Sequence, residues 1–141
     1  MYLHLLSQIN LVAVLISAIV YFMIGSLWYS FLVRDAWVAE LKEHDVTIKQ
    51  HAKEVLRTKM LLTFCANVLA SIAMALLVIM AGSTTVYSGF CLGLLCVLGF
   101  AATTLGTVFI WEHRSCRLFL LDIGYPAIGL IVAAIILSIW Q

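Results

Sequence analysis

The chain has 141 residues, of which 65% are hydrophobic and 11% are charged, and its mean hydropathy is +1.13. An ordinary soluble domain has about 25% charged residues, so this composition excludes a soluble domain. It predicts a single membrane domain over residues 1–141. The formal net charge is only +1 and the basic residues have acidic neighbours, which argues against a nucleic-acid partner.

Four apolar runs follow one another, at about residues 11–33, 60–81, 87–111 and 118–140. Each has the roughly 20 residues that a helix needs to cross a hydrocarbon core about 30 Å thick. Residues 1–10 contain no Lys or Arg, so the basic start of a secretory signal is missing and the first run is predicted to be retained. Because the joints at 82–86 and 112–117 are short, the sequence predicts an all-α, polytopic membrane protein: an antiparallel bundle of four transmembrane helices.

The basic residues are all found in two loops, residues 34–59 and 112–117, which hold all eight Lys and Arg of the chain. Four spans place these two loops on one side of the membrane and both termini on the other. By the positive-inside rule, the loops are cytoplasmic and both termini extracytoplasmic, as expected for an integral protein of a bacterial inner membrane.

Residues 34–59 are predicted to contain an amphipathic cytoplasmic helix between the first two spans. Asp45 or Thr47 is a suitable cap, and apolar residues follow it at helical spacing. Lys49, Lys53 and Arg57 recur every four residues on another side, which predicts contact with anionic lipid of the bilayer. A shorter helix of the same kind is predicted over residues 36–44.

Polar residues of the spans are predicted to form a layer near the cytoplasmic side, because they lie at similar depth when counted at 1.5 Å per residue. The candidates for a ligand-binding or polar layer are Asp122, Asn67, Tyr29, Ser26, Thr103, Thr107, Tyr125, Arg34 and Arg114.

Asp122 matters most within this layer, since a carboxylate on a membrane helix needs a partner. Asn67, Tyr29, Arg34 and Arg114 are the candidate partners. Asp122 is interpreted either as a proton or substrate site open to the cytoplasm, or as a polar contact that holds helices together.

Small residues predict close helix packing. Gly89 and Gly93 form a G-x-x-x-G pattern on the third span, and Gly25, Gly106 and Gly124 are further candidates. Such ridges allow helix backbones to approach closely, either within one bundle or between copies of a homo-oligomer. The sequence leaves both possibilities open.

The sequence predicts no catalytic residue, no metal site and no cofactor. The four cysteines form no C-x-x-C pair, and Glu112 with His113 lacks a third ligand at helical spacing. Nucleotide-binding and nucleophile motifs are also missing.

Several stretches together resemble a known family. Gly25-Ser-Leu-Trp28-Tyr29-Ser30 is followed by Trp37, and later by Glu112-His-Arg114 and Leu118-Phe-Leu-Leu-Asp122-Ile-Gly124-Tyr125. This pattern resembles domain-of-unknown-function family 1761, which consists of small membrane proteins with four predicted spans, and the similarity covers nearly the whole chain. Phe31 departs from it, because proline commonly follows the W-Y-S motif there. The resemblance implies an architecture and no activity.

Three functions remain open. The first is a non-enzymatic, homo-oligomeric bundle with a cytoplasm-facing polar pocket for a small ligand or a partner helix. The second is a small oligomeric transporter or channel that uses Asp122. The third is a membrane enzyme of the glutathione or eicosanoid type, suggested by four spans, a long basic first loop, and Arg57 and Asn67 on the second span.

Overall fold

A computed structural model describes residues 2–43 and 53–140, and within these ranges the chain contains helices and no strands. The helices are α1 (Tyr2–Leu6), α2 (Leu11–Leu27), η1 (Trp28–Leu32), α3 (Arg34–Glu43), α4 (Lys53–Ala81), α5 (Val86–Cys96), η2 (Val97–Ala101), α6 (Ala102–Trp111) and α7 (Cys116–Ile139). Four continuous helical segments are long and apolar enough to cross a membrane: Leu11–Leu32, Leu56–Ala81, Val86–Trp111 and Cys116–Ile139. The predicted all-α, four-span architecture is confirmed.

Side chains cap three of the long helices, which supplies acceptors for backbone N–H groups that have no partner in the first turn. Asn10 accepts from the N–H of Val12 at 3.1 Å and so begins α2. Thr85 and Ser88 form a reciprocal capping box at the start of α5. Ser115 caps α7, so the fourth helix begins two residues earlier than its apolar run.

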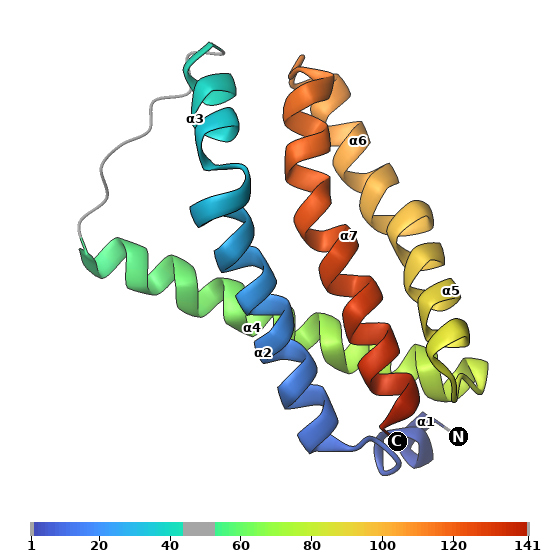
Figure 1. The fold of residues 1–141 in the computed structure, drawn as a ribbon. Coiled ribbons are helices and arrows are strands. Elements are labelled where there is room, and N and C mark those ends of the chain that lie inside the picture. Colours follow the sequence, from blue (N-terminus) through green and yellow to red (C-terminus); the bar gives the residue numbers. More distant parts are fainter. Residues whose placement is uncertain (1, 44–52, 141) are drawn as a thin grey trace.

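Three helical columns lie side by side, and α4 crosses them obliquely (Figure 1). The columns are α2–η1–α3, α7, and α5–η2–α6, with α7 between the other two and running in the opposite direction. Helix α4 packs against α2 and α7. Its first turn lies apart from the columns and about half-way along their length (Figure 1). The crossing of α4 leaves space on either side of its contact with α7.

Both chain ends lie at one end of the bundle, whereas α3 and the α6–α7 turn lie at the other (Figure 1). We call this second end, formed by α3 and residues 112–117, the charged end. Helix α3 continues the direction of α2 and packs against α7 (Figure 1). Its predicted contact with anionic lipid stays a prediction. The predicted caps Asp45 and Thr47, together with Lys49, lie outside the described residues.

The predicted glycine ridge packs inside the bundle. A Cβ atom on Gly93 would lie 2.7 Å from the Cα of Ile131, and one on Gly89 would lie 2.9 Å from the carbonyl oxygen of Ala134. Both glycines therefore allow α5 to approach α7 closely. The ridge is thus occupied within one chain and is unavailable as a contact between copies. Gly106 makes no comparable approach, because a Cβ atom there would lie 3.7 Å from the Phe119 ring, an ordinary contact distance.

Candidate functional site

Two consecutive residues of α7, Leu121 and Asp122, accept hydrogen bonds from aromatic side chains of η1 and α3. The Asp122 carboxylate accepts hydrogen bonds from the Tyr29 hydroxyl (3.2 Å) and the Trp37 indole N–H (3.0 Å). The Trp28 indole donates to the carbonyl oxygen of Leu121 (2.8 Å). These bonds fasten η1 and α3 to α7, so Asp122 has two protein donors at its place in the bundle.

The π-helical turn η1 explains how neighbouring aromatic residues reach the same helix. The N–H of Val33 bonds to the carbonyl of Trp28 at 3.0 Å, which is the wider spacing of a π-turn. Such a turn rotates the side chains that follow it relative to an α-helix, and short π-turns often occur at functional sites. Here it places Trp28 and Tyr29 against α7 and lets α3 continue beside it.

A second hydrogen bond extends the cluster to α4. The Tyr125 hydroxyl donates to Asn67 Oδ1 at 2.9 Å, and the Tyr125 ring packs against that of Tyr29 with centroids 6.0 Å apart. The amide nitrogen of Asn67 and the hydroxyl of Ser71, one turn further along α4, are buried without a partner among the described residues. A buried polar group without a partner costs about 1–3 kcal/mol, so the α4–α7 contact carries a local penalty.

Glycines on α2 and α7 receive these aromatic rings. A Cβ atom on Gly124 would overlap the Trp28 ring, and one on Gly25 would lie 2.7 Å from the ring of Tyr125. Both positions, which the sequence indicated as packing glycines, are therefore sockets for aromatic side chains. Gly129 is a third socket of this kind, for Tyr21, and was not expected from the sequence.

A carboxylate that the sequence analysis missed lies at the charged end. Glu40 is only 5% exposed, accepts a hydrogen bond from the Ser115 hydroxyl (2.8 Å) and pairs with Arg117 (3.3 Å). Trp37 lies one turn earlier on the same face of α3, and it packs against the buried Phe109–Leu118 cluster. Glu40 was overlooked because it lies in a charged segment, although its spacing from Trp37 indicated a shared face.

The structure brings some of the predicted polar-layer residues together and separates others. Asp122, Tyr29, Tyr125 and Asn67 form the hydrogen-bonded cluster, with Ser26 beside it on the wall of a cavity. The remaining four, Arg34, Arg114, Thr103 and Thr107, make no hydrogen bond to this cluster in the described part of the chain.

Neither predicted arginine is among the hydrogen-bond partners of Asp122. Arg34 is exposed, and Arg114 pairs with Glu112 and lies over the ring of Phe109. Thr103 and Thr107 are exposed, and each hydroxyl donates to a carbonyl of its own helix at 2.9 Å. The third span therefore adds neither of its two predicted threonines to the cluster.

A cavity of about 390 Å³ opens between α2 and α4 beside this cluster. We call it the α2–α4 cavity. Its polar lining residues are Ser26, Tyr29, Ser30, Lys59, Thr63 and Tyr125. The cluster thus fixes two of the walls, because the Tyr29 and Tyr125 hydroxyls are held by Asp122 and Asn67.

The chain matches a family model described as "Protein of unknown function (DUF1761)" over residues 12–138. It belongs to the DUF1761 family. A comparison with curated proteins found no match, and neither did a comparison with solved structures. The DUF1761 match begins at the start of α2 and ends near the end of α7, so the whole cluster lies inside it. The resemblance seen in the sequence is confirmed.

The sequence motif of this DUF1761 protein has a structural meaning in the cluster. The W-Y pair at Trp28 and Tyr29 and the D-I-G-Y stretch from Asp122 to Tyr125 are the two sides of one contact. Trp28 and Tyr29 each have a hydrogen-bond acceptor on α7. Gly124, which lies between Asp122 and Tyr125, leaves space for the Trp28 ring. The motif therefore joins the first and last spans.

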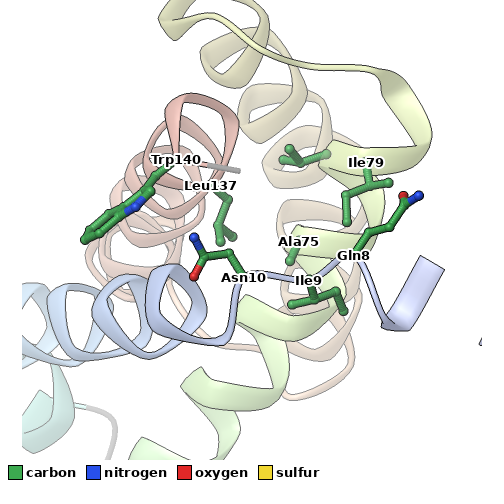
Figure 2. A pocket seen from close by; sticks show the side chains of 8 residues that line it. Gln8, Ile9, Asn10, Ala75, Ile79, Leu137 and Trp140 are labelled. Carbon is green, nitrogen blue, oxygen red and sulfur yellow. The ribbon is translucent and has the colours of Figure 1, made fainter. Parts of the chain in front are cut away.

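A smaller cavity of about 230 Å³ lies at the end that carries the termini (Figure 2). Figure 2 shows it between the α1–α2 joint, α4 and the end of α7, lined by Gln8, Ile9, Asn10, Ala75, Ile79, Leu137 and Trp140. The Asn10 side-chain oxygen is already used in capping α2. Among the described residues of this DUF1761 protein, no group of three His, Cys, Asp or Glu side chains could hold a metal ion.

Proposed function

We propose that this protein is a non-enzymatic membrane binding protein that holds one amphiphilic small molecule in the α2–α4 cavity. The cavity itself carries the proposal. Its volume of about 390 Å³ lies within the range of roughly 300–1,000 Å³ that is usual for small-molecule sites. Hydroxyl groups of Ser26, Ser30 and Thr63 line it together with the rings of Phe22 and Tyr125. A molecule with both polar and apolar parts matches such a lining.

Preorganisation supports the same proposal. A binding site needs walls that are held by contacts behind them. The two tyrosines of the cavity have such contacts, since Tyr29 is bonded to Asp122 and Tyr125 to Asn67. Asp122 does not line the cavity, and it accepts bonds from two neighbouring helical segments. These bonds favour a structural function for Asp122 over the alternative of a transport site.

The proposal includes an orientation in which the charged end faces the cytoplasm of a bacterial inner membrane. The positive-inside rule supports this orientation, since α3 and residues 112–117, which form the charged end, carry Arg34, Lys42, Arg114 and Arg117. It can be tested with epitope tags at the two termini in intact cells. Antibody access from outside the inner membrane is expected for both tags, and access only from the cytosol would overturn the orientation.

Binding can be tested by blocking the cavity. Thr63→Trp places a large ring in the cavity, whereas Leu62→Trp changes a neighbouring exposed residue that does not line it. We expect short-chain detergents with anionic or zwitterionic head groups to raise the melting temperature of the wild type, because a ligand that binds only the folded state stabilises it. Thr63→Trp should lose this shift and Leu62→Trp should keep it. Equal shifts in both variants would overturn the proposal.

A further inference from the structure

Three hydroxyl groups that line the α2–α4 cavity have already donated their protons to other groups of the chain. The Tyr29 hydroxyl donates to the Asp122 carboxylate (3.2 Å), and the Tyr125 hydroxyl donates to Asn67 Oδ1 (2.9 Å). The hydroxyl of Thr63 donates to a carbonyl oxygen of its own helix (2.8 Å). A hydroxyl group has one proton and two lone pairs. Each of these oxygens can therefore accept a hydrogen bond from a ligand but has no proton to donate to it.

The three acceptor oxygens belong to three helical segments around the cavity. Tyr29 lies in η1, Tyr125 in α7 and Thr63 in α4. The rings of Tyr29 and Tyr125 are neighbours, with centroids 6.0 Å apart. Asn67, which accepts from the Tyr125 hydroxyl, lies one turn beyond Thr63 on the same face of α4. A polar group in the cavity thus meets acceptors from η1, α4 and α7.

A carboxylate lies directly behind one of these oxygens. Asp122 does not line the cavity, but it holds the Tyr29 hydroxyl, and its second donor is the neutral indole of Trp37. Arg114, one of the basic residues expected beside Asp122, is paired with Glu112. The negative charge of Asp122 therefore favours a positively charged group next to Tyr29.

The other polar groups of the cavity are compatible with such a ligand. Lys59 lines the cavity but already interacts with another group of the chain, so its charge is engaged there. The hydroxyls of Ser26 and Ser30 also line the cavity, and a hydroxyl can donate to an anionic part of a ligand. A purely anionic head group, in contrast, has no proton for the three acceptor oxygens.

We infer that the α2–α4 cavity selects the primary ammonium group of a zwitterionic amphiphile, as in phosphatidylethanolamine. An ammonium group has three N–H donors, which match the acceptor oxygens of Tyr29, Thr63 and Tyr125. The phosphate of the same head group accepts from Ser26 or Ser30. This inference rests on the proposed function and adds the class of ligand. A free alkylamine carries the same donors and is the second source of this chemistry.

Stepwise methylation of the ammonium group tests the donors without changing the charge. Dioctanoyl phosphatidylethanolamine is compared with its N-methyl, N,N-dimethyl and N,N,N-trimethyl forms, and binding to the purified protein is measured by native mass spectrometry. We expect the affinity to fall with each methyl group, by about tenfold over the series, because each methyl removes a charge-assisted hydrogen bond. Equal affinity for the four lipids would overturn the inference.

A matched pair of threonine variants separates hydrogen bonding from the size of the head group. Thr63 and Thr107 are both exposed, and each hydroxyl donates to the carbonyl four residues earlier, at 2.8 and 2.9 Å, but only Thr63 lines the cavity. Valine has nearly the shape of threonine and lacks the acceptor oxygen. Thr63→Val should lower the preference for the primary ammonium over the trimethyl form about threefold and leave binding of the trimethyl form unchanged. Thr107→Val should keep the full preference.

An undiminished preference in Thr63→Val would show that the cavity merely excludes the larger methylated head groups, which overturns the inference. Circular dichroism at rising temperature confirms that each variant is folded before its binding is compared. Competition with decylamine distinguishes the two sources of the ammonium group. Displacement of the dioctanoyl lipid at equal concentration assigns the site to free amines, whereas retention of the lipid assigns it to the lipid head group.

The outcomes also separate the inference from the proposed function. If Thr63→Trp blocks binding while the wild type binds all four head groups equally, the cavity binds an amphiphile without selecting the ammonium group, and the inference is overturned alone. If Thr63→Trp leaves the binding of every lipid unchanged, the proposed function is overturned together with the inference.

Discussion

Gly124→Ala is expected to destabilise the contact between the first and last spans. The added methyl group would overlap the Trp28 ring, so the ring must move. That movement breaks the hydrogen bond of 2.8 Å from its indole N–H to the carbonyl of Leu121. The substitution therefore tests whether the aromatic socket holds η1 against α7.

The expected magnitude follows from three contributions. Overpacking of a fitted contact costs about 1–3 kcal/mol, and loss of a hydrogen bond costs about 1 kcal/mol. Alanine favours a helix over glycine by about 1 kcal/mol, which offsets part of this. The net loss in the free energy of unfolding should be about 1–3 kcal/mol. Gly99→Ala is the matched control, since a Cβ atom there would meet open space, and it should be neutral or slightly stabilising.

Both variants can be compared with the wild type by reversible unfolding in mixed micelles of increasing sodium dodecyl sulfate content. A double-mutant cycle with Trp28→Leu adds a second check, because the smaller side chain removes the overlap. In that background Gly124→Ala should cost little. Equal stability of Gly124→Ala and Gly99→Ala, or an unchanged cost in the Trp28→Leu background, would refute the reasoning.

Substitutions at three further positions test other contacts by the same unfolding measurement. Asp122→Asn keeps an oxygen acceptor for Tyr29 and Trp37 and should lower the free energy of unfolding by less than about 1 kcal/mol. Asp122→Leu leaves both donors unpaired and should lower it by about 2–4 kcal/mol, so equal losses in the two variants would contradict this. Gly93→Ala should cost about 1–3 kcal/mol, because its Cβ would lie 2.7 Å from the backbone of α7, and a stabilised variant would disprove the close packing. Glu40→Ala should lower the free energy of unfolding more than Glu40→Gln, since only glutamine can still accept the 2.8 Å hydrogen bond from the hydroxyl of Ser115, which caps α7. The reverse order would show that the charge of Glu40 matters more than this bond.

The sequence predicted how far along each helix the polar residues lie better than it predicted whether their side chains face a neighbouring helix or the outside of the bundle. Counting along the helices placed Asn67, Asp122 and Thr107 near the same end of the bundle. Depth depends only on the rise of 1.5 Å per residue, which is the same in every α-helix. Direction depends on how each helix is rotated about its axis, and this is decided by packing. Asn67 therefore meets Tyr125, whereas Thr107, at a similar depth, faces outward and bonds to its own helix.

The partners of Asp122 show a second limit of sequence reasoning. The candidates included two arginines, chosen because opposite charges attract. The structure confirms Tyr29, which was among the candidates, and adds Trp37 as a second hydrogen-bond donor to Asp122. The π-turn at Trp28–Leu32 contributes to this, since it leads directly into α3, which packs against α7. A single wide turn in an apolar run has no clear sequence signal, so Trp37 could be recognised only as a member of the family motif.

The amino-acid sequence by itself determined the class of the molecule: four apolar helices, two basic loops and a polar zone near one end. These properties depend on local composition and segment length, which the bilayer selects directly. Tertiary structure decided which residues meet, since it set the oblique crossing of α4, the glycine sockets and the internal use of the Gly89–Gly93 ridge. Those features arise from contacts between distant segments, and the spacing of residues within one helix carries no information about the rotation of its neighbour.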